Sequence, residues 1–500
     1  MNRRDFLKGT GWMLAAAAAG GCTTAGANAF AGSPFGAPMQ GFRVKPMKRI
    51  RLGVVGCGQR GDVAMPRLAV LPGVDIVALC DIYPERVAFE QKFLKDHGHP
   101  TAKYEFTGPE GYKRLCELDI DLVYNTTDWA HHAEVALYAM RHGKHVFTEV
   151  PAVTTVEEAW EMVETAEKTR LHCMMLENCC YGEAEMFFLN LCRQGKLGEL
   201  VHGECSYIHD LRAGCYADPI INDPNWEHGT GYVDHWRLMH NAAHKGNQYP
   251  THGLGPVCQY MNINRGDRFD YLVSLESNQA NYENYARKTF GDGWKPNLKV
   301  AMGDMNTTLI KTAKGLSIML QHDVSSPRPY SRINRITGTA GAGEGITFCE
   351  KPEDQIQDGC PVKFGWEEKC GAGVHKYFDE KKSAEMREKF RHPYHRTAFE
   401  IAKKVGGHGG IDFMMDLRWA YCLQNGLPLD MDVYDLASWS SINELSERSV
   451  RNRSSSIDIP DFTCGGWKTA KPLDVWNIDI SKLDLEKVNK IQKAAGGMSV

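Results

Sequence analysis

Apolar and polar positions alternate regularly through the first third of the chain. Short apolar runs at 121–126 and 145–149 are interleaved with longer segments of helical periodicity at 130–142 and 154–169. Short buried strands separated by amphipathic helices are typical of a parallel, doubly wound sheet. The pattern therefore predicts an α/β protein whose first domain, residues 48–175, has a Rossmann-type fold.

The pattern changes in the second half of the chain. Strand-like runs at 200–208, 270–277, 307–312 and 317–323 follow one another without regular intervening helices. This order predicts a second, α+β domain over residues 176–427 that contains an open, mostly antiparallel sheet. We expect that sheet to cover one side of a ligand cleft.

Two segments fit neither pattern. Residues 208–250 are rich in His and Trp and have little periodicity, which is typical of lids and substrate loops. Residues 428–500 carry Trp439, Trp467 and Trp476 among polar residues. We expect this last segment to wrap around the body of the protein or to form contacts in an oligomer.

Residues 1–31 have the features of an export signal. Arg3 and Arg4 precede the apolar run 12–19, and this order is typical of the twin-arginine route, which exports folded proteins. We therefore expect export to the periplasm by the twin-arginine machinery. Cys22 follows Ala-Gly-Gly and is a candidate site of lipidation, which would anchor the protein to a membrane. Cleavage at small residues further along the chain is the alternative.

Composition narrows the classes of partner. A chain of 500 residues with 43% apolar content can fill two hydrophobic cores. The formal net charge is −4, and no basic run is interleaved with aromatic residues. These features argue against a nucleic-acid partner and against a strongly anionic substrate.

A glycine motif carries the clearest chemistry. An apolar run leads into Gly56, Gly58 and Gly61, in the sequence GCGQRG. In such a motif the glycines form a tight turn, let the backbone approach a pyrophosphate, and let the next helix pack closely. A second strand-like run ends at Asp81, whose carboxylate can accept bonds from ribose hydroxyls and would repel a 2′-phosphate. The motif therefore predicts NAD rather than NADP.

Together these motifs resemble a known family. The order GCGQRG, CDIYPERV, NTTDWAHHAEVALYAMRHGKHVFTEVPA and LENCCYG resembles the Gfo/Idh/MocA oxidoreductases and, more narrowly, glycoside hydrolase family 109. The resemblance extends over about 50–335. It implies an NAD-dependent α-N-acetylgalactosaminidase that acts on a neutral amino-sugar glycan with retention, through oxidation, elimination, addition and reduction with tightly bound NAD. We also expect a homo-oligomer.

Two departures from the wider family point to the catalytic groups. That family usually has a lysine where this chain has Val150, and an aspartate where it has Gln248. His252 remains as a titratable group, and a neutral imidazole can remove a proton near neutral pH. We therefore expect His252 to transfer the proton, Glu149 to assist from the nicotinamide side, and Tyr249 to be the competing proton-transfer residue.

The resemblance also implies which residues contact the ligands. Those expected to contact NAD are Gly56, Gly58, Gln59, Arg60, Gly61, Asp81, Trp129, His132, Glu149, Val150, Asn178 and Tyr249. Those expected to line the sugar are Tyr207, Arg237, Tyr249, Pro250, Thr251, His252 and Tyr330.

Several alternatives stay open. Trp129 and His132 open a helix and could simply cap and pack it. His240 and His244 have the spacing of metal ligands on a helix, but no Glu accompanies them as in HExxH, and we expect a solvated helix face without metal. For the whole protein, the alternatives are an exported NAD-dependent sugar or polyol dehydrogenase and a non-catalytic nucleotide- or sugar-binding protein.

Overall fold

A computed structural model describes residues 33–217, 231–345, 362–367 and 376–495. The predicted export signal and Cys22 lie outside these ranges. Within the described ranges, no helix combines the length and the apolar character needed to cross a membrane.

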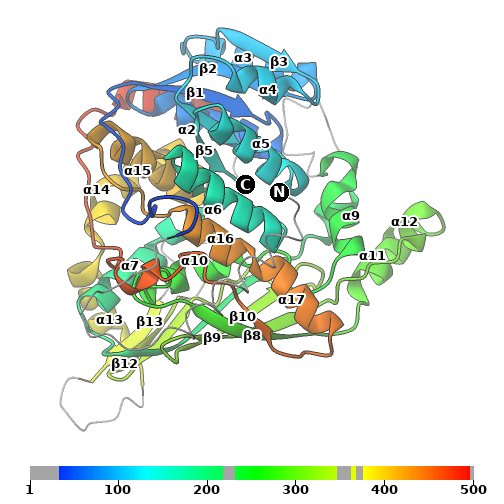
Figure 1. The fold of residues 1–500 in the computed structure, drawn as a ribbon, viewed down its shortest axis with the longest axis vertical. Coiled ribbons are helices and arrows are strands. Elements are labelled where there is room, and N and C mark those ends of the chain that lie inside the picture. Colours follow the sequence, from blue (N-terminus) through cyan, green and yellow to red (C-terminus); the bar gives the residue numbers. More distant parts are fainter. Residues whose placement is uncertain (1–32, 218–230, 346–361, 368–375, 496–500) are drawn as a thin grey trace, which may run out of the picture. The chain divides into compact units, whose positions relative to one another are not determined.

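The first domain is built on a six-stranded parallel sheet (Figure 1). Its strands are in the order β3-β2-β1-β4-β5-β6, and every neighbouring pair is parallel. The elements are β1 (Ile50–Val55), α2 (Gln59–Val70), β2 (Val74–Asp81), α3 (Pro84–Asp96), β3 (Tyr104–Thr107), α4 (Gly111–Cys116), β4 (Leu122–Asn125), α5 (Trp129–Arg141), β5 (His145–Thr148), α6 (Val156–Thr169) and β6 (Cys173–Met175). The strand order reverses between β1 and β4, where doubly wound sheets bind ligands at the carboxyl ends of their strands.

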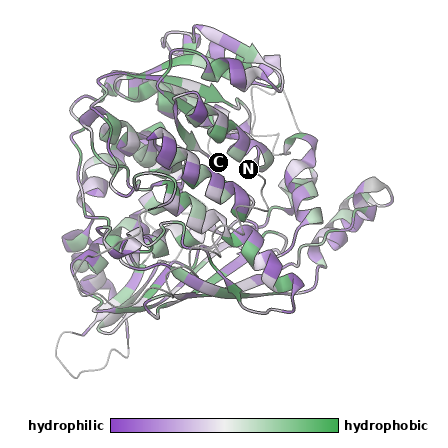
Figure 2. Ribbon diagram, in the orientation of Figure 1, coloured by the Kyte–Doolittle hydropathy of each residue, from purple (hydrophilic) through white to green (hydrophobic). Residues whose placement is uncertain are grey.

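Local chemistry explains why these elements start where they do. The central strands β4 and β5 are buried at every position. Figure 2 colours the ribbon by the hydropathy of each residue, with hydrophobic residues in green. Helix α5 begins after Asp128, whose side chain accepts from the backbone N–H groups of Ala130 and His131. Helix α6 begins with a capping box between Thr155 and Glu158. The predicted Rossmann-type domain is confirmed.

The second sheet has eight strands in the order β13-β12-β11-β7-β10-β9-β8-β14. Its strands are β7 (Leu200–Ile208), β8 (Phe269–Glu276), β9 (Asn306–Thr312), β10 (Ser317–Asp323), β11 (Arg335–Gly338), β12 (Gly341–Gly345), β13 (Val362–Trp366) and β14 (Ile457–Asp458). Strands β7 and β10 are parallel and the other pairs are antiparallel, which confirms the predicted mostly antiparallel sheet. On the outer face, Leu275 is 66% exposed and Leu309 is 49% exposed.

Helices fill the space between the two sheets. In Figure 1, α10 (Thr251–Tyr260) and α16 (Val433–Ser440) lie between the parallel sheet and the antiparallel one. Helix α10 packs on β7, and α16 packs on α6 and β6. The other helical elements are η1 (Asn178–Tyr181), α7 (Glu183–Arg193), α8 (Arg212–Tyr216), η3 (Val233–His235), α9 (Trp236–Ala243), α11 (Asn281–Phe290), α12 (Trp294–Asn297), α13 (Glu380–Phe390), α14 (Pro393–Val405), η5 (His408–Gly410), α15 (Ile411–Asn425), α17 (Ile442–Arg451), η6 (Gly466–Lys468) and α18 (Leu485–Ala495).

The last segment differs from the predicted tail. Its first part forms α16 and α17, which are internal helices because their apolar faces pack on the parallel sheet and on β8. Trp439 on α16 is accordingly only 1% exposed. The part after α17 does run around the molecule, since β14 pairs with β8 and α18 packs against α2 and α14.

Helix α15 connects the second half of the chain to the first domain. It packs on η1 and on α2. Arg67 of α2 is 1% exposed and donates to Asp416 of α15 across 2.8 Å, and its guanidinium also lies 3.4 Å from Asp412. Two buried carboxylates of α15 therefore face a buried arginine of the first domain.

Candidate active site

The glycine motif forms a turn that only glycine fits. Gly56 has a φ of +94°, and a Cβ atom there would lie 2.6 Å from the carbonyl oxygen of Thr126. A Cβ atom on Gly61 would lie 2.0 Å from the carbonyl oxygen of Gly56. Gly58 is the N-cap of α2 and no side chain caps the helix there. The first amides of α2 therefore face a backbone cradle that suits a phosphate group.

Asp81 stands at the edge of this cradle. Its carboxylate accepts from the backbone N–H of Cys57 at 2.7 Å and from that of Tyr83 at 2.9 Å. Burial raises the pKa of Asp81, although these hydrogen bonds and Arg86 act in the opposite direction. The cradle, the uncapped helix and a carboxylate at the end of β2 fit NAD in the arrangement that doubly wound sheets use.

Several residues expected at NAD have other partners. Arg60 donates to Glu149 at 2.7 Å and lies 3.7 Å from Asp412, so its guanidinium is held between two carboxylates. His132 is 1% exposed, and its two ring nitrogens face the carbonyl oxygens of Thr127 and Pro151 at 2.8 Å each. His132 therefore links the loops that contain Thr127 and Pro151, as the alternative of a structural role for this residue expects.

The remaining expected NAD residues surround the cradle. Gln59 begins α2 and is exposed, and Val150 is buried directly after Glu149. Asn178 begins η1, where its side-chain amide donates to Asp412. Trp129 begins α5 and stacks on Tyr249 at a centroid distance of 5.5 Å.

An aromatic cage surrounds Arg237. Its guanidinium lies 4.9 Å from the ring centres of both Trp129 and Tyr249, and 5.9 Å from that of Tyr207. One Nη donates to the hydroxyl of Tyr232 at 3.1 Å, while Nε and the other Nη are buried with no partner among the described residues. Unpaired buried donors are costly, so this guanidinium is suited to bind an acceptor on a ligand.

Helix α10 presents the expected proton-transfer residue. Pro250 caps the helix, Thr251 is its first residue, and His252 projects from its first turn. The imidazole Nε2 lies 3.4 Å from the hydroxyl of Tyr249. Burial raises the pKa of Tyr249 well above its ordinary value, so the phenol stays protonated and donates to Nε2. An imidazole in this state can accept a proton at Nε2.

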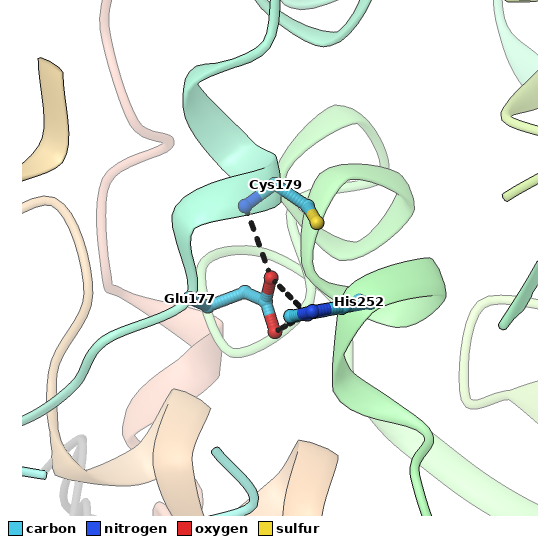
Figure 3. A group of neighbouring side chains, drawn as sticks. All are labelled: Glu177, Cys179 and His252. Atoms are coloured by element: carbon cyan, nitrogen blue, oxygen red, sulfur yellow. Dashed lines mark hydrogen bonds and ion pairs between the residues drawn. The ribbon is translucent and has the colours of Figure 1, made fainter. Parts of the chain in front are cut away.

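Glu177 orients this imidazole (Figure 3). Its carboxylate lies 2.8 Å and 3.0 Å from His252 Nδ1 and also accepts from the backbone N–H of Cys179 at 3.1 Å. Glu177 is fully buried. Burial raises the pKa of Glu177, but the charge and hydrogen bond of His252, together with hydrogen bonds from Thr251 and the backbone of Cys179, lower it overall. The carboxylate therefore stays ionised and fixes the proton of His252 on Nδ1.

Sequence reasoning missed Glu177. The motif LENCCYG contains it, but only Asn178 was assigned a role there. Its signal is a carboxylate directly after the buried apolar run 173–176, because a buried acid needs a partner. That partner lies 75 residues further along the chain, at a distance in sequence that no local pattern reveals.

The remaining sugar residues lie around this pair. The ring of Tyr207 is 5.4 Å from that of His252 and 6.0 Å from that of Tyr330. The hydroxyl of Tyr330 accepts from Arg332 at 3.2 Å. The structure thus brings together Trp129, Tyr207, Arg237, Tyr249, His252 and Tyr330.

The histidines with metal-like spacing do not converge on one point. His240 Nε2 bonds to Gln248 at 2.8 Å, whereas His244 Nδ1 bonds to Glu447 at 2.9 Å. Within the described ranges, Glu177, Cys179 and His252 form a group whose possible ligand atoms lie close enough for a metal. Burial raises the pKa of the Cys179 thiol well above its ordinary value, and Glu177 bonds directly to His252. This group is therefore best described as a hydrogen-bonded carboxylate-imidazole pair.

Fold and site together define an NAD-binding protein of the Gfo/Idh/MocA type that has a second domain rich in proton-transfer groups. Residues 50–177 match the family model "Oxidoreductase family, NAD-binding Rossmann fold". Residues 181–469 match the model "Glycosyl hydrolase 109, C-terminal domain". The chain belongs to glycoside hydrolase family 109, and it is a glycoside hydrolase with an NAD-binding Rossmann domain.

Curated relatives cover most of the chain. An "Alpha-N-acetylgalactosaminidase" of Bacteroides fragilis is 47% identical over 431 residues, which are 86% of this chain and 95% of that protein. A "Glycosyl hydrolase family 109 protein" of Shewanella pealeana is 42% identical and covers 95% of this chain and 99% of its own length.

Solved structures share the fold. An oxidoreductase domain protein from Kribbella flavida has a TM-score of 0.61 at 19% identity, over 83% of this chain and 100% of its own. A levoglucosan dehydrogenase in complex with NADH and L-sorbose has a TM-score of 0.59 at 16% identity, over the same shares of the two chains. At these identities the likeness describes the fold alone.

Proposed function

We propose that this protein hydrolyses terminal α-linked N-acetylgalactosamine with retention, using tightly bound NAD. The observation that carries the proposal is the imidazole of His252, oriented by ionised Glu177, with Nε2 directed at the hydroxyl of Tyr249. The name of the relative from Bacteroides fragilis supports the choice of sugar.

NAD would be held by the cradle of Gly56, Gly58 and Gly61, with Asp81 at its ribose. When bound, NAD supplies a hydride acceptor and donor for C3 of the terminal sugar. Val150 stands where related dehydrogenases have a lysine, and its side chain cannot assist proton transfer at the reacting carbinol.

His252 serves the neighbouring carbon. The proton on C2 is acidic once C3 is a carbonyl, because its removal gives an enolate. His252 Nε2 takes this proton while Glu177 stabilises the imidazolium that forms. The glycosidic oxygen then leaves C1, water adds to C1, and His252 returns the proton to C2. This sequence needs no pair of carboxylates flanking the glycosidic bond.

The aromatic cage would select the sugar. Tyr207 and Tyr249 offer ring faces for a pyranose, and the unpartnered nitrogens of Arg237 suit the acetamide carbonyl oxygen. The guanidinium of Arg237 can donate to that carbonyl oxygen, while the surrounding rings contact the apolar faces of the sugar.

A sugar or polyol dehydrogenase is the second candidate, since the solved neighbours include a levoglucosan dehydrogenase. An assay without added NAD separates the two candidates. Its substrates are α- and β-linked aryl glycosides, each with and without the N-acetyl group. The proposal expects release of aglycone from the α-N-acetylgalactosaminide without accumulation of NADH. Accumulation of NADH with free sugar, and no release of aglycone, would favour the dehydrogenase.

Variants test the roles of the residues. We expect His252→Ala to lower turnover by about 10²–10⁴-fold, which is typical of lost general acid-base catalysis. His142→Ala, on the exposed end of α5, is the matched control and should keep normal turnover. If His252→Ala stays active while Tyr249→Phe is inactive, the proton transfer belongs to the tyrosine.

Export by the twin-arginine route to the periplasm, with lipidation at Cys22, is part of the same proposal and rests on the sequence of residues 1–31. Radiolabelled palmitate incorporated by the wild type and lost in Cys22→Ser would support the anchor.

A homo-oligomer is also proposed, and the apolar side chains of Leu275 and Leu309 on the outer face of the eight-stranded sheet offer a surface for it.

A further inference from the structure

Two hollows in the surface of the second domain adjoin α13, a helix that packs on α7 and on β13 (Figure 1). One has a volume of about 540 Å³ and the other of about 440 Å³, and Lys389 lines both. Sites for small molecules have volumes of about 300–1,000 Å³. None of the described residues that line the hollows belongs to the active site above. The hollows are therefore a separate feature with room for a ligand.

Positive charge is concentrated in these hollows. The described residues that line them include seven cationic side chains and three carboxylates, whereas the whole chain has a formal net charge of −4. A concave surface with an excess of one charge attracts ligands of the opposite charge. We call this surface the basic groove, and its cations are Arg193, Lys196, Lys381, Lys382, Lys389, Arg391 and Arg396. Of these, Arg396 forms an ion pair with Glu388.

Three of the cations have no anionic partner within the described ranges. The ammonium groups of Lys196 and Lys389 lie 5.2 Å and 5.5 Å from the ring centre of Phe390. These cation–π contacts position both lysines without neutralising their charges. Arg391 donates through Nε to His395 Nδ1 at 3.2 Å, and its two terminal nitrogens bond to no described residue. The three cations can therefore bind an anion without first breaking an ion pair.

A half-buried guanidinium lies in the larger hollow. Arg193 donates to the backbone carbonyl oxygen atoms of Gln259 at 2.7 Å and Tyr260 at 3.4 Å, and to that of Leu473. These carbonyl groups hold the guanidinium in place but carry no net charge. Burial lowers the pKa of Arg193, although Asp474 acts in the opposite direction. An anion in the hollow would stabilise this charge.

The other lining groups favour a glycan as the ligand. Trp366 and Phe390 bring aromatic rings to the smaller hollow, and Asn190 and Gln194 bring amides to the larger one. Amides and carboxylates can bond to sugar hydroxyls, whereas the three carboxylates would repel the uniformly charged backbone of a nucleic acid. Met386 and Phe390 of α13 are buried, so their side chains are not available for insertion into a membrane.

We propose that the basic groove is a second glycan-binding site and that its ligand is an anionic glycan whose sugars carry sulfate or carboxylate groups. The two terminal nitrogens of Arg391 can bond to two oxygens of one such group. Lys389 can contact an anion in either hollow, because it lines both. Such a site holds a glycan chain on the surface of the enzyme. The inference goes beyond the proposed function and does not depend on which sugar the active site removes.

The test uses three polymers with the same glucose backbone: neutral dextran, carboxymethyl dextran and dextran sulfate. All three lack N-acetylgalactosamine, so their binding does not report on the proposed substrate. In titration calorimetry, the full-length protein should bind at least one of the two anionic polymers and should not bind dextran. The polymer that binds more tightly identifies the anionic group. Lys389→Ala/Arg391→Ala should weaken this binding by about 10- to 100-fold, because two charged contacts are lost.

The matched control is Lys48→Ala/Lys95→Ala, which removes two exposed lysines of the first domain and changes the net charge equally. It should bind the anionic polymers as the wild type does. Thermal unfolding midpoints equal to that of the wild type show that both double variants fold. If Lys389→Ala/Arg391→Ala unfolds earlier, Lys196→Ala provides the same test from outside α13, with an expected weakening of about 2- to 5-fold.

Two kinds of result would overturn the inference. One is that neither anionic polymer binds, or that the two double variants lose binding equally, because the attraction would then come from net charge alone. The other is tighter binding of an oligothymidylate or of phosphatidylglycerol vesicles, lost in Lys389→Ala/Arg391→Ala. That result would assign the basic groove to a nucleic acid or to a membrane. Either result leaves the proposed function in place.

Discussion

Replacing Glu177 by glutamine tests whether a buried carboxylate controls the reactive imidazole. Glutamine keeps the size of the side chain and removes its charge. Charge-assisted hydrogen bonds contribute about 1.5–3 kcal/mol, and the two carboxylate oxygens of Glu177 lie 2.8 Å and 3.0 Å from His252 Nδ1. Loss of that stabilisation in the transition state lowers kcat/KM by about 10- to 150-fold.

The amide can also reverse the tautomer. If the glutamine NH₂ donates to Nδ1, the imidazole proton moves to Nε2, where His252 should accept a proton, and the loss becomes larger. A buried acid-to-amide change beside a catalytic histidine costs about 10⁴-fold in serine proteases. We therefore expect kcat/KM to fall by at least about 10-fold and by at most about 10⁴-fold.

The assay is kcat/KM on the aryl α-N-acetylgalactosaminide from pH 5 to pH 9. The loss in Glu177→Gln should appear across this range, because the imidazolium loses its anionic partner in the transition state. Glu199→Gln, on an exposed glutamate, is the matched control and should keep the wild-type kcat/KM. A Glu177→Gln protein with wild-type kcat/KM would refute the reasoning.

Three further results are expected. Gly56→Ala should lose most of its bound NAD, because the new Cβ meets a carbonyl oxygen at 2.6 Å; wild-type amounts of NAD in the heat-released supernatant would contradict this. Arg237→Lys should lower kcat/KM about 10- to 100-fold on the aryl α-N-acetylgalactosaminide and less on the aryl α-galactoside, since a lysine lacks the bidentate fork. Equal losses on the two substrates would show that Arg237 does not bind the acetamide group. Burial lowers the pKa of His145 to about 4 and of His172 and His322 to about 3. Below about pH 6.5 each of these histidines binds a proton in the unfolded chain but not in the folded one. The free energy of unfolding should therefore fall as the pH drops from 6.5 toward 4, by up to about 1.4 kcal/mol per residue per pH unit. Urea unfolding with the same midpoint at pH 7 and pH 5 would be inconsistent with this.

The elements with short-range signals are the ones that the sequence predicts well. The apolar runs at 200–208 and 317–323 are strands with those same limits. The Trp and polar residues from 428 onward predict a tail, but residues 433–440 and 442–451 form helices. Their burial depends on the sheets they pack against, and that partner surface is distant in sequence.

In the candidate site, too, local features are predictable from the sequence and long-range contacts are not. The cradle of Gly56 and Gly61 is predictable because its glycines act within one turn. The expected contact of Arg60 with a pyrophosphate stays a prediction, whereas its ion pairs with Glu149 and Asp412 were not foreseen, and Asp412 belongs to a helix 352 positions further on (412 − 60). The partner of a buried charge cannot be read from spacing when the two groups come from different domains.

The ion pair between Arg67 and Asp416 has a consequence for how the protein is made. These residues are 349 positions apart, and Arg67 is 1% exposed. Leaving one member of a buried pair without its partner costs about 3–5 kcal/mol, so the nucleotide-binding half lacks this stabilisation until residue 416 has been synthesised. We therefore expect a chain cut short before α15 to form a less stable Rossmann domain than the full-length protein contains.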